Sequence, residues 1–481
     1  MTNGSGSIAQ AAPAISLPAP GASRTRLLLE GPIVSTLLRL AAPNIVVNVV
    51  LIAVTATVDA HFVGRLGPDA LAGLSLVFPL IMLMQQMANS SMGGAIASAI
   101  ARAIGAGQHA DASALVIHAI VIAAGMAAIF ASVLLIAGPA IYALMGGAGD
   151  TRVAALEYSN AIFAGALAYW LLSTLTSVVR GTGQATILAV VYLAAEALHI
   201  LLVPVLMFGL GPLPPLGITG AGIATVASFT ASSSALAWYI ASGRTAIKLS
   251  LRRVRLNQRL FVEILRVGAP MSLQPILNNL ALATLTGFVG TLGAAPLAGF
   301  GVAVRLEYLL YPLAFGLGAG VLAMVGTNIG AGNLPRAARI AWTAAAIAAG
   351  VTGCIGLFGL TLPDTWTGLF TKAPEVHVLA ANYLVIVGLA YPFLGLGLTL
   401  ASTFQAAGRP LWPLLGVTGR ALIVALGGWI AVHFTGTDLT SLAVVAAFGL
   451  FVYGASLTIA FRAGVWRTSR VETRLGATKR S

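Results

Sequence analysis

Five formally charged residues lie inside long apolar stretches of this sequence, where lipid or other apolar helices are the expected surroundings. They are Asp59, Glu196, Arg305, Glu307 and Arg420. A charge at bilayer depth is costly unless it is paired or functional, so each of the five is a candidate functional residue. Carboxylates in such a place can bind and exchange protons or small cations.

Asp59 stands in TVDAHFVG, in the outer half of an apolar run that begins near Pro43. The functional interpretation is a carboxylate withdrawn from water that holds a proton near neutral pH and exchanges it for a cation. The structural alternative is that Asp59 pairs with a neighbouring helix or reaches outward to the membrane surface. Pairing with Arg305 across a central cavity is a further option.

Glu196 and His199 are three residues apart in a later run, VVYLAAEALHILLVP, and therefore share one helical face. The two side chains could share a proton or a cation. The alternative is a buried structural pair.

Arg305 and Glu307 are only two residues apart, so they do not face each other on one helix, and each needs a partner elsewhere. Either they contribute to a substrate cavity or they clamp helices together. Arg420 leaves the same two options open, and we favour a structural role for it.

Uncharged polar side chains in the apolar runs are further candidates for a substrate path. An unsatisfied amide in lipid is costly, so each should face a cavity or another helix, and contact between helices is the commoner role. These residues are Asn44, Asn48, Gln85, Gln86, Asn89, Gln274, Asn278 and Asn279, while Tyr192 offers an aromatic face to a cation.

The composition indicates the elements that position these side chains. Of 481 residues, 58% are apolar and 8% are charged, against about 25% charged in soluble proteins. Twelve apolar runs are long enough to cross a bilayer, which takes about 20 residues in a helix. The pattern predicts an all-α integral membrane protein with twelve transmembrane helices. The expected spans are residues 41–63, 71–97, 114–137, 158–179, 185–208, 217–241, 266–290, 296–325, 338–361, 378–401, 410–434 and 440–463.

The basic residues predict the orientation. With a cytoplasmic N-terminus, 21 of the 26 Lys and Arg residues fall on the inside and three, namely Arg65, Arg152 and Lys372, fall outside. Cytoplasmic loops carry such an excess, so we expect a protein of the cell inner membrane with both termini cytoplasmic. The net charge of +13 is then explained by topology and membrane lipid, and we expect no nucleic-acid partner.

Two halves of the chain resemble each other. LRLAAP (38–43) recurs as LRVGAP (265–270), FVGRLGPDALAG (62–73) as FVGTLGAAPLAG (288–299), and IGAG (104–107) at 329–332. Six spans in each half place both halves in the same orientation, as in transporters built from parallel repeats. We therefore predict two six-helix lobes related by a pseudo-two-fold axis. The expected divisions are a disordered cytoplasmic tail (1–32), the N-terminal lobe (33–243), a basic linker (244–263), the C-terminal lobe (264–463) and a basic tail (464–481).

These motifs in this order resemble the multidrug and toxic compound extrusion (MATE) family, over roughly residues 33–465. The resemblance implies export of cationic or amphipathic compounds against proton or sodium flow, and it matches Asp59 to the family's proton-coupling aspartate in the first helix. In the fifth span, His199 and Val203 stand where relatives carry an Asn and an acid before a proline. Either Glu196 and His199 replace that pair, or coupling rests on Asp59 alone. Sodium-coupled relatives use acids in the seventh and tenth spans, which hold none here, and this favours protons.

The predicted function is secondary active antiport, with no enzyme activity, no metal and no cofactor beyond a proton or sodium gradient. No GxxxxGK[ST] loop is present to bind ATP. We expect small organic cations as substrates and a monomeric protein. The alternative is a lipid-linked oligosaccharide or polysaccharide flippase of similar architecture, which would need several cationic groups in its cavity.

Overall fold

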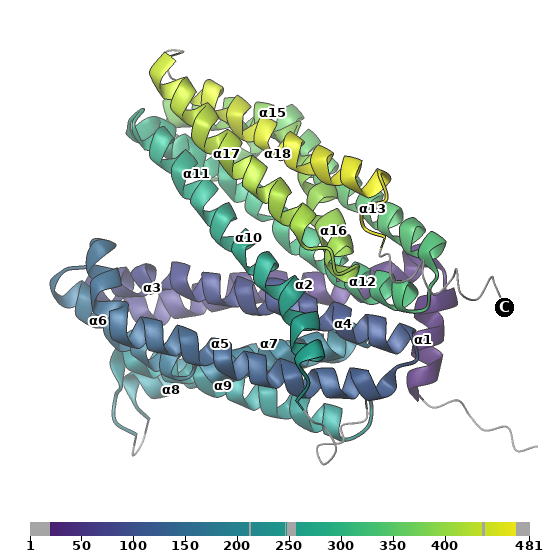
Figure 1. Cartoon of the computed structure of the whole chain (residues 1–481). Helices are drawn as coiled ribbons and strands as arrows, with labels where there is room; N and C mark the ends of the chain where they lie inside the picture. The colour runs from purple at the N-terminus through teal and green to yellow at the C-terminus, as the bar shows by residue number, and fades with distance from the viewer. Residues whose placement is uncertain (1–19, 211–212, 246, 248–255, 435–437, 468–481) are drawn as a thin grey trace, which may run out of the picture.

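A computed structural model describes residues 20–210, 213–245, 247, 256–434 and 438–467, and every regular element in them is a helix. The N-terminal lobe follows a short helix, α1 (Pro20–Glu30). Its elements are α2 (Ile33–Gly64), α3 (Pro68–Gln86), the π-helix η1 (Met87–Met92), α4 (Gly93–Gly105), α5 (His109–Leu144), α6 (Gly149–Ala164), α7 (Ala166–Gly181), α8 (Ala185–Phe208) and α9 (Gly217–Ala241). Figure 1 shows these helices, from purple to teal, lying side by side in one lobe.

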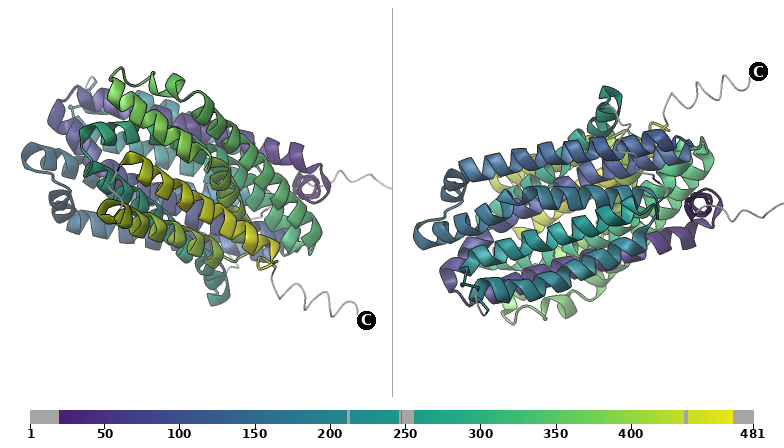
Figure 2. Two further views of the ribbon diagram at one scale, coloured as in Figure 1. Left: turned by 90° about the horizontal axis from the view of Figure 1, so that it is seen from above. Right: turned by 90° about the horizontal axis from the view of Figure 1, so that it is seen from below.

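The C-terminal lobe repeats this arrangement. Its elements are α10 (Gln258–Gly290), α11 (Ala294–Tyr308), α12 (Leu310–Gly330), α13 (Leu334–Thr361), α14 (Pro363–Thr367), α15 (Pro374–Gly388), α16 (Tyr391–Ala406), α17 (Leu411–Phe434) and α18 (Leu439–Arg462). Each lobe has a cluster of buried apolar side chains, and the first part of the other lobe's first long helix, α2 or α10, contributes to it. The views from above and below show the two lobes on opposite sides of the molecule (Figure 2).

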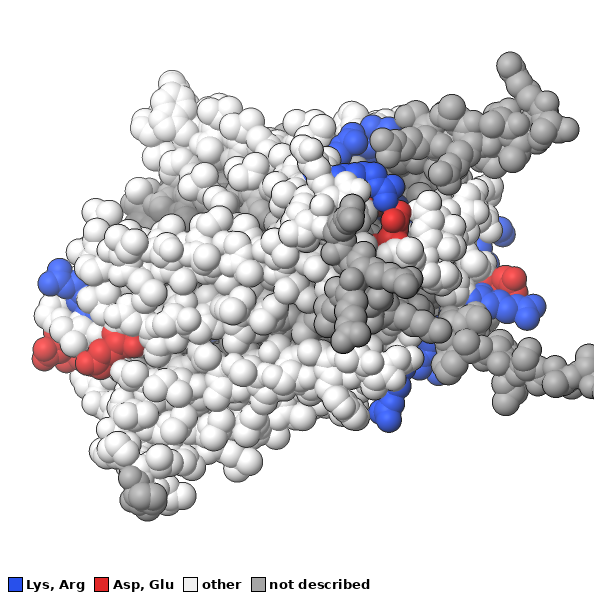
Figure 3. Space-filling view, turned by 60° about the horizontal axis from the view of Figure 1, so that its bottom comes forward, with Lys and Arg blue, Asp and Glu red and all other residues white. Residues whose placement is uncertain are grey.

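Each predicted span coincides with one helix or with consecutive helices, although 158–179, 296–325 and 378–401 run across breaks between helices, and the predicted fold class is confirmed. Within the described residues, nine helical segments are long and apolar enough to cross a membrane. Two broken pairs, α6 with α7 and α15 with α16, bent by 49° and 52°, raise this to eleven if each pair is one span, and Ile33–Asn48 of α2 is a shorter apolar helix. The charged residues described on the face drawn in Figure 3 lie at the two ends of the molecule and leave an uncharged band between them.

The ends of the predicted segments differ in part from the structure. Pro20–Glu30 forms a helix where we expected disorder over residues 1–32. Leu28 is buried beside Gly183 of one lobe, and its carbonyl oxygen accepts a hydrogen bond from Asn328 of the other. Contacts with residues far away in the sequence therefore hold helix α1 in place, and the composition of residues 1–32 alone does not indicate them. The basic linker is also shorter than predicted, because α10 already begins at Gln258. Residues 1–19, 248–255 and 468–481 lie outside the described part.

The two lobes meet near one end of the molecule and diverge toward the other (Figure 1). At the meeting end, α4 crosses α12 with backbone against backbone. A side chain on Gly105 would collide with the carbonyl group of Thr327, and one on Gly330 with that of Arg102. Glycine is required at these two positions because no Cβ fits between the helices.

The π-helical turn η1 lies at this junction of the lobes. A π-helix leaves backbone groups that need other partners, and such turns are frequent at functional sites. Gln405 of α16 donates hydrogen bonds to the carbonyl oxygens of Ser90 and Ser91, at 3.0 and 2.9 Å. The Ser91 hydroxyl donates to the carbonyl oxygen of Met271 in α10, at 2.9 Å. The irregular turn of one lobe is therefore completed by the other.

Candidate functional site

Asp59 lies inside the N-terminal lobe, near the end of α2 that is remote from the junction of the lobes. Its side chain reaches α8, where Asp59 Oδ1 is 2.9 Å from His199 Nε2. Asp59 is 6% exposed and His199 3% exposed, so little water screens the pair. In this low-dielectric setting the interaction of the carboxylate with a protonated imidazole is strong.

Tyr158 of α6 completes the contacts of Asp59. Its hydroxyl donates a hydrogen bond to Asp59 Oδ2 at 3.3 Å, and Thr225 of α9 lies close to the Tyr158 side chain. Asp59 on α2 is thus contacted by polar groups from two other helices, α8 and α6. Sequence reasoning did not identify Tyr158 or Thr225, because an isolated Tyr or Thr in a span is usually a packing residue. The repeat offers one signal, since Tyr158 aligns with Tyr383 of the second half.

Glu196 lies one turn before His199 on α8 and is 8% exposed. It lies close enough to His199 to interact with it electrostatically, and the sharing of a proton or cation by the two side chains stays a prediction. The structure adds that His199 makes its direct hydrogen bond to Asp59. The predicted pair of Glu196 and His199 is therefore part of a larger group, and His199 lies between two carboxylates.

The charged residues of the second half do not join this site. Glu307 pairs with Arg420, with Arg420 Nη2 at 3.3 Å from Glu307 Oε1, which supplies the partner that each residue needed. Arg305 is exposed on α11, and its guanidinium lies 5.0 Å from the centre of the Phe370 ring. The option of a contact between Asp59 and Arg305 is not seen in this structure.

Some of the uncharged polar candidates bond within their own helices, and others bond to a neighbouring helix. Asn44, Asn48 and Asn279 each donate to the carbonyl oxygen four residues earlier. Asn89 accepts a hydrogen bond from Arg180 of α7 at 3.0 Å, and Tyr192 contacts Thr176 at 3.2 Å. Gln85, Gln86, Gln274 and Asn278 are half-buried. These hydrogen bonds lie within one helix or join two helices, and they bring none of these residues to Asp59.

The geometry around Asp59 allows one kind of chemistry in particular. With neutral His199, which then donates its Nε2 proton, the Asp59 carboxylate keeps its negative charge. When His199 takes up a second proton, the pair of side chains becomes neutral overall. A buried group whose net charge changes with one proton can hold a cation in one state and release it in the other.

Comparison with known proteins follows the same division into halves. The family model described as MatE matches residues 44–205 and 270–430. The chain is 25% identical over 412 residues to a protein of Shewanella oneidensis named "FAD transporter", a match that covers 84% of this chain and 90% of the relative. It is 26% identical over 418 residues to "Probable multidrug resistance protein YoeA" of Bacillus subtilis, with 84% and 89% covered.

Solved structures with the same fold include a transporter described as "Crystal structure of MATE in the bent conformation". It matches with a TM-score of 0.84 at 24% identity and covers 94% of this chain and 98% of that one. A transporter of the MOP superfamily from Pyrococcus furiosus, whose description reports "reverse polarity of binding pocket", matches with a TM-score of 0.82 at 24% identity. That match covers 92% of this chain and 99% of the other.

Proposed function

Since the family model matches most of both halves, this chain belongs to the MatE family of membrane transporters, and we propose that it is an antiporter that exports organic cations in exchange for protons at Asp59. The observation that carries the proposal is the buried contact of Asp59 with His199 and Tyr158. Family membership makes the protein a membrane transporter and not an enzyme, and the relatives named for multidrug resistance or export support efflux of drugs. The coupling ion, the substrate and the residues of the site belong to the proposal.

The exchange of a cationic substrate for a proton follows from the negative charge of the buried Asp59 site. A buried net negative charge is unfavourable without a counter-ion. Either a cationic substrate nearby or a proton on the pair of Asp59 and His199 supplies that counter-charge, and each one weakens the binding of the other. A proton arriving from outside therefore favours release of the substrate there, and loss of the proton to the cytoplasm restores substrate affinity. Glu196 adds to the negative potential at His199 and so favours both occupants.

The test uses the purified protein in proteoliposomes and a fluorescent organic cation, under a proton gradient and, separately, a sodium gradient. We expect a proton gradient alone to drive transport. Asp59→Asn should abolish proton-driven transport, while Asp69→Asn, which changes an exposed carboxylate bonded to Thr151, should leave it intact. Full proton-driven transport by Asp59→Asn would refute the proposal. Transport driven only by a sodium gradient would identify sodium, and not the proton, as the coupling ion.

A flavin nucleotide is a second candidate substrate. The relative from Shewanella oneidensis is named for FAD, and the exposed Arg305 beside Phe370 offers a cation and an aromatic ring to an aromatic anion. Adding FAD to the same assay separates the two substrates. Competition by FAD that is lost in Arg305→Gln would favour the nucleotide, and no competition would favour the organic cation.

The flippase alternative finds no comparable support. It requires several free cationic groups in a cavity, and Arg420 is bonded to Glu307. We propose a protein of the cell inner membrane that works as a monomer with both termini in the cytoplasm, in keeping with the distribution of its basic residues.

A further inference from the structure

The C-terminal lobe contains a small cavity that corresponds to the Asp59 site through the internal repeat. At these positions the repeat shifts the sequence by 225 or 226 residues, which pairs Asp59 with Leu285, Tyr158 with Tyr383 and His199 with Val424. The last helices of the two halves, α9 and α18, end at the equivalent glycines Gly243 and Gly464, and this shift of 221 residues pairs Thr225 with Ala446. All four counterparts line one cavity of about 20 Å³, room for about one water molecule.

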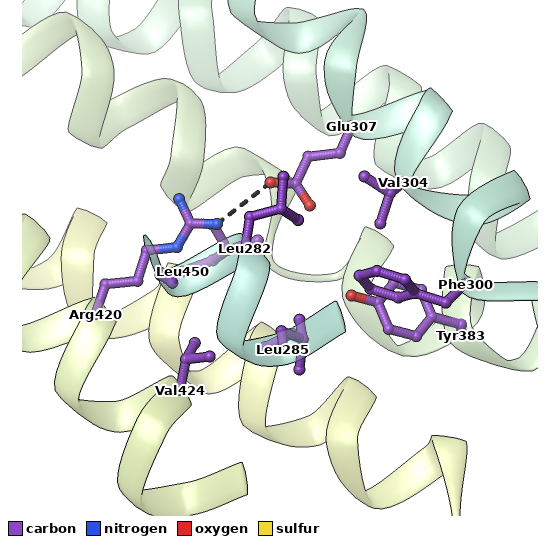
Figure 4. Close-up of a pocket in the computed structure, with 11 residues that line it drawn as sticks. Leu282, Leu285, Phe300, Val304, Glu307, Tyr383, Arg420, Val424 and Leu450 are labelled. Atoms are coloured by element: carbon purple, nitrogen blue, oxygen red, sulfur yellow. Dashed lines mark hydrogen bonds and ion pairs between the residues drawn. The ribbon is translucent and has the colours of Figure 1, made fainter. Parts of the chain in front are cut away.

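This cavity has lost the charged and polar groups of the N-terminal site and has acquired others. Aspartate, histidine and threonine have become leucine, valine and alanine, while the tyrosine is retained. Glu307 and Arg420 line the cavity instead, and their ion pair spans it (Figure 4). Glu307 aligns with the apolar Ile81, and Arg420 aligns with Ala195, next to Glu196 on the equivalent helix.

The two sites differ in the permanence of their counter-charge. In the N-terminal lobe the carboxylate faces an imidazole, which gains and loses a proton near neutral pH. In the C-terminal lobe the carboxylate faces a guanidinium, which stays charged at every pH a protein meets. Tyrosines surround this pair, and they do not ionise near neutral pH. Those within electrostatic reach of Glu307 or Arg420 are Tyr308, Tyr311, Tyr383, Tyr391 and Tyr453.

We infer that Arg420 occupies the cation site of the C-terminal lobe as a tethered cation, so that ion exchange is confined to the N-terminal lobe. Arg420 is then a specificity-determining residue that sets how many ions are exchanged in one transport cycle. This inference rests on the proposed exchange at Asp59. It goes further by assigning the opposite behaviour, permanent occupancy, to the pseudo-equivalent cavity.

The experiment removes the tethered charge and looks for an ion in its place. In Arg420→Gln the carboxylate of Glu307 loses its counter-ion, and a buried carboxylate in that state takes up a proton or a small cation. Infrared spectroscopy detects a protonated acid by its carbonyl band, and radioactive sodium detects a bound cation. We expect Arg420→Gln to gain one site by one of these two readouts, the double variant with Glu307→Gln to lose it again, and Arg420→Lys to gain none.

Three results would overturn the inference. The first is a folded Arg420→Gln protein, eluting as a single species, that gains neither a proton nor sodium. The second is gain of a site by Arg420→Lys. The third concerns Glu307→Gln, which does not depend on the folding of the arginine variants: if it reduces the number of protons exchanged per substrate, Glu307 is itself a coupling group. The infrared and sodium-binding measurements do not require transport, so a failure in either of them is distinct from failure at Asp59.

Discussion

Removal of the Tyr158 hydroxyl provides a quantitative test of the Asp59 site. In Tyr158→Phe the ring is retained, and Asp59 Oδ2 loses a donor at 3.3 Å. A hydrogen bond to a charged group contributes about 1.5–3 kcal/mol, and this bond is longer than the 2.5–3.0 Å typical of O–H···O. We therefore expect the lower limit, about 1.5 kcal/mol.

The direction in which the pH of half-maximal transport changes depends on which form of Asp59, ionised or protonated, the Tyr158 hydroxyl stabilises. The hydroxyl stabilises the ionised carboxylate, so its loss makes proton binding more favourable and half-protonation occurs at higher pH. One pH unit corresponds to about 1.36 kcal/mol, so the pH of half-maximal transport should rise by about one unit. The assay is uptake of the fluorescent cation into proteoliposomes over a range of pH.

A matched control separates this effect from general destabilisation. Tyr142 of α5 is buried beside α6, the helix that carries Tyr158, and it donates a hydrogen bond to Ser159 at 2.6 Å without contacting Asp59. Tyr142→Phe should lower stability by about 1 kcal/mol and leave the pH midpoint where it is. A midpoint that stays in place or falls in Tyr158→Phe, or that moves equally in both variants, would refute the role assigned to the hydroxyl.

Two further predictions concern stability. Gly330→Ala places a Cβ against the carbonyl group of Arg102 and should lower the free energy of unfolding by about 1–3 kcal/mol. The control is Gly125→Ala, in open space on α5, which should leave the free energy of unfolding unchanged or raise it by roughly 0.5–1 kcal/mol. Equal effects of the two substitutions would contradict the backbone contact. Asp438 caps α18 by accepting a hydrogen bond from the Ser441 amide at 2.8 Å, and this bond lowers the pKa of Asp438 in the folded protein. The cap therefore stabilises the protein above the ordinary carboxyl pKa, and this stabilisation is lost as the pH falls through the lowered pKa of the folded state. Asp438→Ala should cost about 1 kcal/mol near neutral pH, and its unfolding temperature should converge with that of the wild type in acid.

The spans were predictable because the length of an apolar run is a local property of the sequence. The repeat then grouped them into two lobes without any knowledge of contacts. Breaks within spans were not predicted. α6 ends and α7 begins around Gly165, and the equivalent break separates α15 from α16. Neither stretch is interrupted by charge, so hydropathy reads each broken pair as one continuous helix.

The site shows the same division between local and distant information. Asp59 and His199 were identified one by one, since an ionisable side chain in an apolar run is conspicuous. Their contact joins residues 140 positions apart, and helical spacing alone assigned His199 to the nearer Glu196. Arg420 was likewise recognised without its partner Glu307, because only the packing of α11 against its neighbours brings them together.

The glycine contact between α4 and α12 has a mechanical consequence. Where two backbones touch directly, one helix can turn against the other without a side chain leaving its cavity or changing rotamer. Rotation about this point moves the nearby atoms least and the remote loops most. The loop after α2, at Arg65, and the segment before α15, at Lys372, are therefore the positions where paired spectroscopic labels would register the widest swing of the two lobes.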